Sequence, residues 1–301
     1  MTITKKRIEN DTPFDGKTLT SLSYAKCRLI REMKKVISLF FLSVAICACT
    51  GGGGNTAEEQ RDAVRECAEW DSVTCKECSR PMGEEENKPS CSVDVSVESA
   101  VGSTPVDSCI SRTVAAVVFG DTLCLCPDAV RHYADSVKRS FAEEMSEFYD
   151  PDDEFAFRFH YTYEVRGGRV SDSKEGTVAY RASETTYQGG AHGSFAEVCL
   201  NMDASTGREL FLSDVFKEDK LGRVKELMEQ QLMADRGVKS MEQLRDSTGI
   251  TMLAEVFVSD YNFLLLKDGV LFVFNPYDIA PWAVGTVEVK LTYDQLKGCL
   301  K

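Results

Sequence analysis

Histidine, the residue that most often serves as a general acid or base, is scarce in the 301-residue sequence, which contains only three. Around His132, His160 and His192 there is no Ser-His-Asp order, no phosphate-binding loop and no zinc-protease motif. His132 and His160 fall on the polar sides of a predicted helix and a predicted strand, where we expect them to be solvated. No nucleophile or acid stands at a recognisable spacing from His192. We therefore expect a protein that is not an enzyme, with no catalytic residue, no cofactor and no metal site.

Basic residues are also in the minority. The chain has 35 lysines and arginines against 48 aspartates and glutamates, a net charge of −13. Residues 1–48 hold 9 of these basic and 4 of these acidic side chains, so residues 49–301 carry 26 basic and 44 acidic ones, a net charge of −18. A nucleic-acid partner needs a basic face and is not expected. A cationic partner would be attracted to such a surface, although the charge also accounts for simple solubility.

The apolar segment 36–48 is too short to span a membrane, because it has 13 residues and a spanning helix needs about 20. Two lysines precede it, and a small residue, Ala48, ends it. A positive flank, a short apolar run and a small residue are typical of a cleavable secretory signal. We expect the protein to be exported, with Met33 as the start of the signal and residues 1–32 as an upstream extension.

The segment Ile46-Cys47-Ala48-Cys49 resembles the lipobox of bacterial lipoproteins, with an aliphatic residue, two small residues and a cysteine. The resemblance implies cleavage before Cys49, a diacylglycerol on its thiol, and a second acyl chain that makes the membrane anchor stable. No acidic run follows Cys49, which by resemblance to known sorting signals favours the periplasmic face of the outer membrane over the cell surface. An ordinary signal peptide with a chance cysteine is the alternative.

Nine further cysteines predict disulfides, because an exported chain folds in an oxidising compartment. Since nine is odd, at least one thiol stays free or pairs with another molecule, and the pairing does not follow from the sequence. A zinc site built from the pairs Cys75–Cys78 and Cys124–Cys126 is the alternative, but the second spacing is too short for the usual zinc knuckle. The nine are Cys67, Cys75, Cys78, Cys91, Cys109, Cys124, Cys126, Cys199 and Cys299.

The residues directly after the lipobox are predicted to form no domain of their own. Four glycines at 51–54 predict a flexible tether. The polar, acidic segment 55–90 predicts a cysteine-containing stalk with a short helix at 63–70. About 210 residues follow, which is enough for one large domain or two small ones.

Hydrophobic periodicity predicts the elements of the remaining chain. Alternating apolar residues, short apolar runs and turn residues indicate strands at 93–97, 113–119, 155–165, 176–186, 195–202, 209–212, 261–266, 270–274 and 285–291. Spacings of three or four residues indicate helices at 128–149, 221–232 and 293–300, the last capped by Thr292. Gly167-Gly168 and Asp268-Gly269 are predicted hairpin turns. Because strands and helices come in clusters without strict alternation, we expect an α+β fold with antiparallel sheets.

Two apolar stripes are predicted to face the core. On the helix at 128–149 the stripe is Val130, Tyr133, Val137, Phe141, Met145 and Phe148. On the strand at 155–165 it is Phe155, Phe157, Phe159, Tyr161, Tyr163 and Val165.

Three segments resemble, in order and spacing, the extracellular domain of lysozyme-sensing anti-sigma factors of the RsiV type. They are 187–193, 203–216 and 272–285. The same domain accompanies peptidoglycan deacetylases of the PdaC type and occurs in envelope lipoproteins of unknown function. The resemblance covers about residues 91–300 and implies an N-terminal α+β subdomain at 91–175 and a C-terminal one at 176–301. This sequence shows neither the transmembrane and sigma-binding segments nor the deacetylase domain of those proteins.

Four residues are candidates for binding a partner. His192 lies in a glycine-rich loop. Its functional interpretation is a ligand contact or a general base. We favour the structural interpretation, in which His192 forms a hydrogen bond across a tight turn that the glycines allow. Tyr277 and Trp282 lie in a loop rich in proline and aromatics. Such side chains stack on a sugar or fill a partner's cleft, or else they cover the edge of the core. Tyr187 has the same two interpretations.

The sequence therefore predicts a lipid-anchored envelope protein that binds an extracytoplasmic partner, either a lysozyme-like muramidase or peptidoglycan. The acidic surface suits a basic enzyme as partner. One alternative is an enzyme acting on cell-wall glycan, in which His192 and a carboxylate such as Asp278 meet in one cleft. The other is a structural component of an envelope assembly, with an exposed apolar patch in place of a cleft.

Overall fold

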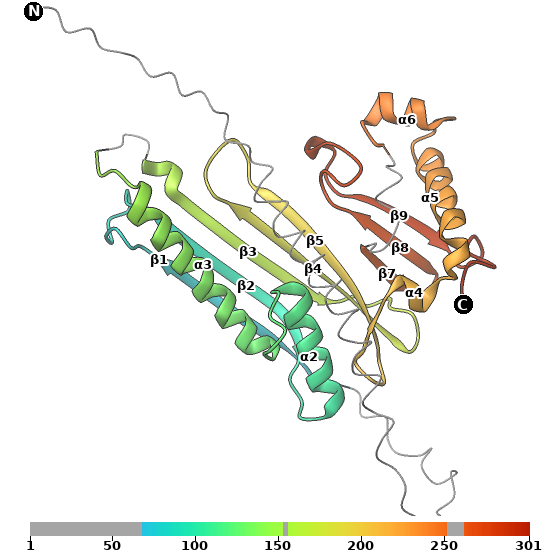
Figure 1. Ribbon diagram of the computed structural model, residues 1–301, viewed down its shortest axis with the longest axis horizontal. Helices are drawn as coiled ribbons and strands as arrows, with labels where there is room; N and C mark the ends of the chain where they lie inside the picture. Colours follow the sequence, from blue (N-terminus) through green and yellow to red (C-terminus); the bar gives the residue numbers. More distant parts are fainter. Residues whose placement is uncertain (1–67, 153–155, 252–261) are drawn as a thin grey trace, which may run out of the picture. The chain divides into compact units, whose positions relative to one another are not determined.

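The computed structural model describes residues 68–152, 156–251 and 262–301, which all belong to the compact unit Gly54–Lys301. The predicted signal at 36–48, Cys49 and Cys67 lie outside the described residues. The predicted α+β fold with antiparallel sheets is confirmed (Figure 1). None of the helices described is both long and apolar enough to cross a bilayer.

A six-stranded sheet, in the order β1-β2-β3-β4-β5-β6, forms the N-terminal part of this unit. Neighbouring strands are antiparallel except β2 and β3, which are parallel. A parallel pair needs a long crossover, and α2 and α3 supply it between β2 and β3. The elements are β1 (Trp70–Ser79), β2 (Ser90–Ala100), α2 (Pro105–Val118), α3 (Cys126–Phe148), a 3-10 turn η1 (Ala156–Phe159), β3 (His160–Arg169), β4 (Thr177–Tyr187), β5 (Ser194–Asp203) and β6 (Glu209–Leu210).

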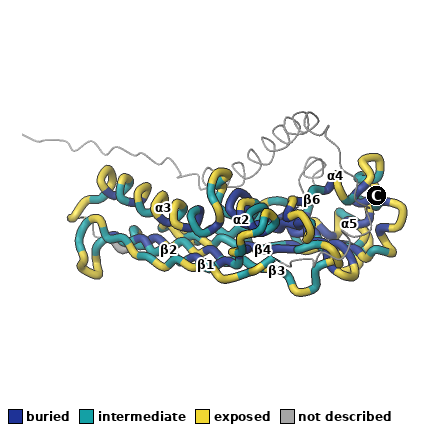
Figure 2. The backbone as a smooth tube through the Cα atoms, turned by 90° about the horizontal axis from the view of Figure 1, so that it is seen from below, coloured by how far each residue is buried: buried dark blue, intermediate teal, exposed yellow. Residues whose placement is uncertain are grey.

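The helices α2 and α3 lie along one face of this sheet (Figures 1 and 2). Valines at alternate positions of β2 point to the helices, because side chains of a strand alternate between its two faces. A fully buried core results, with Val93, Val95, Ile110, Val114 and Phe141 each at most 2% exposed. The predicted helical stripe is confirmed except at its end, where Phe148 is 63% exposed.

A second, three-stranded antiparallel sheet, in the order β7-β8-β9, packs against α5. The predicted hairpin at Asp268-Gly269 and the predicted apolar stripe of the helix at 221–232 are both confirmed. The elements are α4 (Leu212–Val215), a 3-10 turn η2 (Glu218–Lys220), α5 (Leu221–Asp235), α6 (Met241–Thr248), β7 (Asn262–Leu266), β8 (Gly269–Phe274), a 3-10 turn η4 (Trp282–Val284) and β9 (Val287–Thr292).

Buried asparagine side chains join β5 to β7 where the two sheets meet. The amide of Asn201 donates to Phe263 O at 2.9 Å and accepts from Leu265 N at 2.7 Å. Asn262 accepts from the backbone N–H of Cys199 and donates to Glu197 O at 2.8 Å. A side-chain amide carries both a donor and an acceptor, so these residues satisfy backbone groups that have no strand neighbour and thereby hold the sheets together.

The prediction of a strand at 113–119 is wrong, because α2 extends to Val118 and Phe119 is its C-cap. Thr104 and Asp107 form a capping box at its start, and Pro105 occupies a first-turn position where no N–H is needed. A short apolar run does not distinguish a buried strand from a buried helix, and the cap decides for the helix here.

The prediction of a hairpin turn at Gly167-Gly168 is also wrong, since both residues lie inside β3. Gly167 pairs with Ala182, and a Cβ at Gly167 would stand 2.9 Å from Tyr180 Oη and 3.0 Å from Ala182 Cβ. The glycine therefore allows a close approach of side chains and does not mark a turn. The strand itself begins at His160, later than predicted, after η1; Phe155 and the side chain of Phe157 lie outside the described residues.

Residues 70–79, expected in a stalk, form β1, which pairs along its whole length with β2. The expected boundary between residues 175 and 176 falls between β3 and β4, which are hydrogen-bonded neighbours. The two sheets instead divide the chain after β6. At the C-terminus, residues 293–300 form turns and not the predicted helix, although Thr292 Oγ1 does accept from Gln295 N at 3.2 Å. The helix α6 was not predicted.

The prediction of disulfides is wrong for the thiols of Cys75, Cys78, Cys91, Cys109, Cys124, Cys126 and Cys299, which are free. A four-cysteine zinc knuckle is not formed either, because Cys126 is fully buried in the core between the helices and the sheet. Cys91, Cys126 and Cys299 are buried, which is the ordinary behaviour of free cysteine as a small hydrophobic residue.

Candidate functional site

Two loops, 187–193 and 275–285, carry all four predicted binding residues. The first joins β4 to β5 and contains three glycines. Gly189 has φ +78° and Gly190 φ +93°, which side-chain-bearing residues rarely adopt, and a Cβ at Gly193 would lie 2.5 Å from Thr186 O. The loop is thus a tight turn, as predicted from its glycines.

Asn275 attaches the second loop to the first sheet. Its Oδ1 accepts from Glu197 N at 2.6 Å and its Nδ2 donates to Glu197 O at 2.9 Å. Asn275 is 6% exposed, so both bonds are shielded from water. Because Glu197 lies on β5, which begins directly after the glycine-rich loop, these bonds fix the two loops relative to each other.

A strained turn presents Tyr277 at the surface. Asp278 N donates to Asn275 O at 3.0 Å, which closes a four-residue turn with Pro276 in its second position. Tyr277, in the third position, has φ +74°, and no other described non-glycine residue has a positive φ. Glycine or asparagine is usual at that place in such a turn. A bulky residue in the left-handed region costs about 1–3 kcal/mol and is found most often at functional sites.

In the same turn, the carboxyl group of Asp278 is largely buried. Its Oδ2 accepts from Asn275 N at 2.7 Å, which completes the turn. Burial disfavours the charged form and raises the pKa of Asp278 to about 6, while the bond from Asn275 lowers it. The group therefore serves the geometry of the loop.

The loops meet through a stack of aromatic rings. The rings of His192 and Trp282 are 4.8 Å apart with an interplanar angle of 15°, and those of Tyr277 and Trp282 are 6.1 Å apart at 29°. His192 is exposed, Trp282 is half-buried, and Tyr277 is 58% exposed. We refer to His192, Tyr277 and Trp282 as the aromatic platform. Flat, partly exposed rings held by two loops offer large contact area with little loss of conformational entropy on binding.

The structure thus brings three of the four predicted binding residues together. Tyr187 is separate: it is 36% exposed, its Oη donates to Gly190 O at 3.2 Å, and in the described part of the chain no ring contact joins it to the platform. His192 does not bond across the turn: its Nδ1 lies 2.8 Å from the O of the next residue, Gly193. Sequence reasoning missed Asn275, although the Asn-Pro dipeptide is a turn signal that pointed to this loop.

His132 and His160 were predicted to be solvated, but each has a side-chain partner in the structure. His160 is half-buried, and its Nδ1 lies 2.7 Å from Ser90 Oγ. His132 is exposed but pairs with Asp121, with 2.9 Å between Nδ1 and Oδ2.

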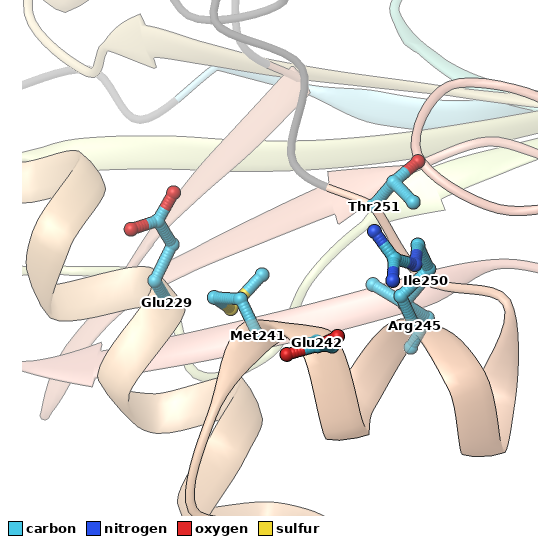
Figure 3. Close-up of a pocket in the computed structure, with 6 residues that line it drawn as sticks. All are labelled: Glu229, Met241, Glu242, Arg245, Ile250 and Thr251. Atoms are coloured by element: carbon cyan, nitrogen blue, oxygen red, sulfur yellow. The ribbon is translucent and has the colours of Figure 1, made fainter.

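An open cavity of about 430 Å³ lies between α5 and α6 (Figure 3). Its rim is attached to the platform loop, because Thr251 N donates to Ile279 O at 2.7 Å. The polar side chains in its wall are exposed or half-buried, so the cavity is a hollow of the surface and not a desolvated catalytic pocket. It is lined by Glu229, Met241, Glu242, Arg245, Ile250 and Thr251.

Comparison with known proteins agrees with this fold. Residues 213–294 match the family described as "Protein of unknown function (DUF3298)". A crystal structure of a DUF3298 family member from Bacteroides fragilis is 28% identical in sequence and covers 78% of this chain and 94% of its own, with a TM-score of 0.69. A DUF3298 family protein from Pseudomonas aeruginosa, 15% identical, covers 79% of this chain and 96% of its own with a TM-score of 0.54, which shows a shared fold alone. No curated protein matches the sequence. The segment that matches this family includes Tyr277 and Trp282.

Proposed function

We propose that this protein is a non-catalytic binding module of the bacterial envelope, which holds an extracytoplasmic partner on its aromatic platform. The contact of the Trp282 ring with the rings of both His192 and Tyr277 is the observation that carries the proposal, because it holds a strained, exposed tyrosine in a fixed position. Large aromatic side chains at the centre of an interface contribute much of its binding energy.

A lysozyme-like muramidase is the partner that best suits these features. Residues 49–301 have a net charge of −18, which favours a basic protein through long-range attraction. The resemblance of the loops to the extracellular domain of RsiV-type factors favours the same partner. Peptidoglycan is the second candidate, because stacked tyrosine and tryptophan rings also suit a sugar ring.

The signal and lipobox support a lipid anchor at Cys49 and a position at the outer membrane facing the periplasm. The alternative of a glycan-acting enzyme needs His192 and Asp278 in one cleft. In the described residues His192 Nδ1 faces Gly193 O and Asp278 Oδ2 faces Asn275 N, and no bond joins the two side chains. This supports a binding role over a catalytic one.

The test is binding of the protein to lysozyme, measured by calorimetry over a range of salt concentrations. We expect a Kd below about 1 µM that persists at about 0.15 M salt. Tyr277→Ala and Trp282→Ala should each weaken binding at least tenfold, roughly 1.4 kcal/mol or more. Phe148→Ala is the matched control, because Phe148 is an exposed aromatic residue on α3, outside the platform.

Binding that disappears with modest salt, or that Phe148→Ala weakens as much as Tyr277→Ala does, would exclude the platform as a lysozyme site. Sedimentation with insoluble peptidoglycan, using the same variants, then tests the second candidate. Loss of sedimentation in Tyr277→Ala alone would assign the platform to glycan. If binding of neither lysozyme nor peptidoglycan depends on the platform, a role as a structural component of an envelope assembly becomes the favoured alternative.

A further inference from the structure

A second cluster of reactive side chains lies far along the chain from the aromatic platform, in the connection between α2 and α3. Asp121 and Cys124 belong to this connection, and His132 lies in the second turn of α3. Asp121 Oδ2 stands 2.9 Å from His132 Nδ1, and Cys124 Sγ stands 3.7 Å from the same nitrogen. One ligand atom from each of the three residues lies within 4.8 Å of the others.

The connection holds these groups in place through its own hydrogen bonds. The backbone N–H groups of Leu123 and Cys124 donate to Asp121 Oδ1 at 2.9 and 3.0 Å. Oδ2 is thereby left to face His132. Arg112 donates to Leu123 O at 2.8 Å and ties the connection back to α2. Ligands of protein-bound metals are oriented by bonds of this kind.

The combination of donor atoms selects the metal. A thiolate and an imidazole suit zinc, whereas calcium and magnesium prefer oxygen ligands throughout. Zinc binds sulfur at about 2.3 Å and nitrogen or oxygen at about 2.0–2.2 Å, so tetrahedral geometry places nitrogen about 3.4 Å from oxygen and about 3.6 Å from sulfur. The observed N···O and N···S separations of 2.9 and 3.7 Å require a small opening of the His–Asp contact, and the ligand atoms of Asp121 and Cys124, which lie within 4.8 Å of each other, must also reach this spacing.

We propose that Asp121, Cys124 and His132 form a zinc site with one open coordination position. On binding, the Cys124 thiol releases its proton to solvent as the Zn–S bond forms. His132 binds through Nδ1, so the hydrogen that Nδ1 shares with Asp121 passes to solvent and the neutral ring carries its proton on Nε2. The His132 side chain is 61% exposed, so the fourth position faces water. The metal would fasten the connection to α3. The proposal is independent of the function of the aromatic platform.

The test is metal binding by the full-length chain, reduced and stripped of metal. Zn²⁺ is titrated against a chromogenic chelator, and Co²⁺ serves as a spectroscopic probe. We expect one Zn²⁺ per chain and a cobalt–thiolate charge-transfer band. Cys124→Ser and His132→Gln should each weaken Zn²⁺ binding at least about tenfold, and Cys124→Ser should abolish the thiolate band.

Cys78→Ser is the matched control, because Cys78 is another exposed free thiol, placed on β1. It should leave affinity, stoichiometry and spectrum unchanged. His132 is exposed, so His132→Gln tests the site even if Cys124→Ser alters the fold. Unchanged Zn²⁺ affinity in both site variants, loss of binding in Cys78→Ser, or no binding by the unsubstituted chain would overturn the proposal and leave an ordinary His–Asp ion pair.

Discussion

Replacing Asp278 by asparagine should change the dependence of stability on pH in a defined direction. Burial raises the pKa of this carboxyl from 3.8 to about 6 in the folded chain. A group with a raised folded pKa adds stability that is fully present below its unfolded pKa and is lost as pH rises through the folded pKa. A shift of about two units corresponds to about 3 kcal/mol lost between about pH 4 and about pH 7.

In the unsubstituted chain, the carboxylate of Asp278 accepts a hydrogen bond from Asn275 N at 2.7 Å. An asparagine side chain at this position also has an oxygen that can accept this bond, but it carries no charge to bury. The unfolding free energy of Asp278→Asn, minus that of the unsubstituted chain, should therefore rise by about 2–3 kcal/mol from about pH 4 to about pH 7.5. Urea denaturation at several pH values measures it. Asp268→Asn is the control: Lys290 lowers the pKa of Asp268 below its ordinary value, so its difference should stay nearly constant above about pH 4 and change only at lower pH. A difference for Asp278→Asn that stays constant over this range would refute the reasoning.

Tyr277→Gly should raise the unfolding free energy, measured by thermal denaturation, by about 1 kcal/mol, because glycine adopts the positive φ without strain. The same change should abolish binding of the partner to the platform. A lower unfolding free energy in this variant would contradict the inference that Tyr277 is strained. Arg181 donates from Nε to Glu197 at 3.0 Å and also forms an ion pair with Glu288 on β9. Arg181→Met should lower the unfolding free energy, measured by urea denaturation, by about 3 kcal/mol, because it leaves the nearly buried carboxylate of Glu197 unpaired. A decrease below about 1 kcal/mol would show that the pair behaves as an ordinary surface ion pair. Cys78 is exposed and should be alkylated by iodoacetamide in the native protein. Cys91 is fully buried and burial raises its pKa to about 12, so it should react only on unfolding. Mass spectrometry distinguishes the two sites, and labelling of Cys91 in the native protein would contradict its burial.

Local chemistry was enough to predict part of this fold. The alternation of Val93, Val95 and Val97, the helical stripe through Phe141 and the Asp-Gly hairpin at 268–269 are confirmed, because each depends on neighbours within a few residues. The strand predicted at 113–119 and the turn at 167–168 failed, because a buried apolar run and a pair of glycines fit more than one local structure. The capping residues of α2 determine that the first segment is helical. The close approach of Tyr180 to Gly167 explains the glycine inside β3.

The sequence by itself determined which residues of the candidate site have the chemistry to bind: His192 in its glycine-rich turn, and Tyr277 and Trp282 in a proline-containing loop. It did not determine that they touch, since 90 residues separate His192 from Trp282. That contact exists because Asn275 bonds the backbone of β5, which only the pairing of two sheets brings within reach. Interactions between distant residues are set by packing of the whole domain, and no local pattern in a single sequence encodes them.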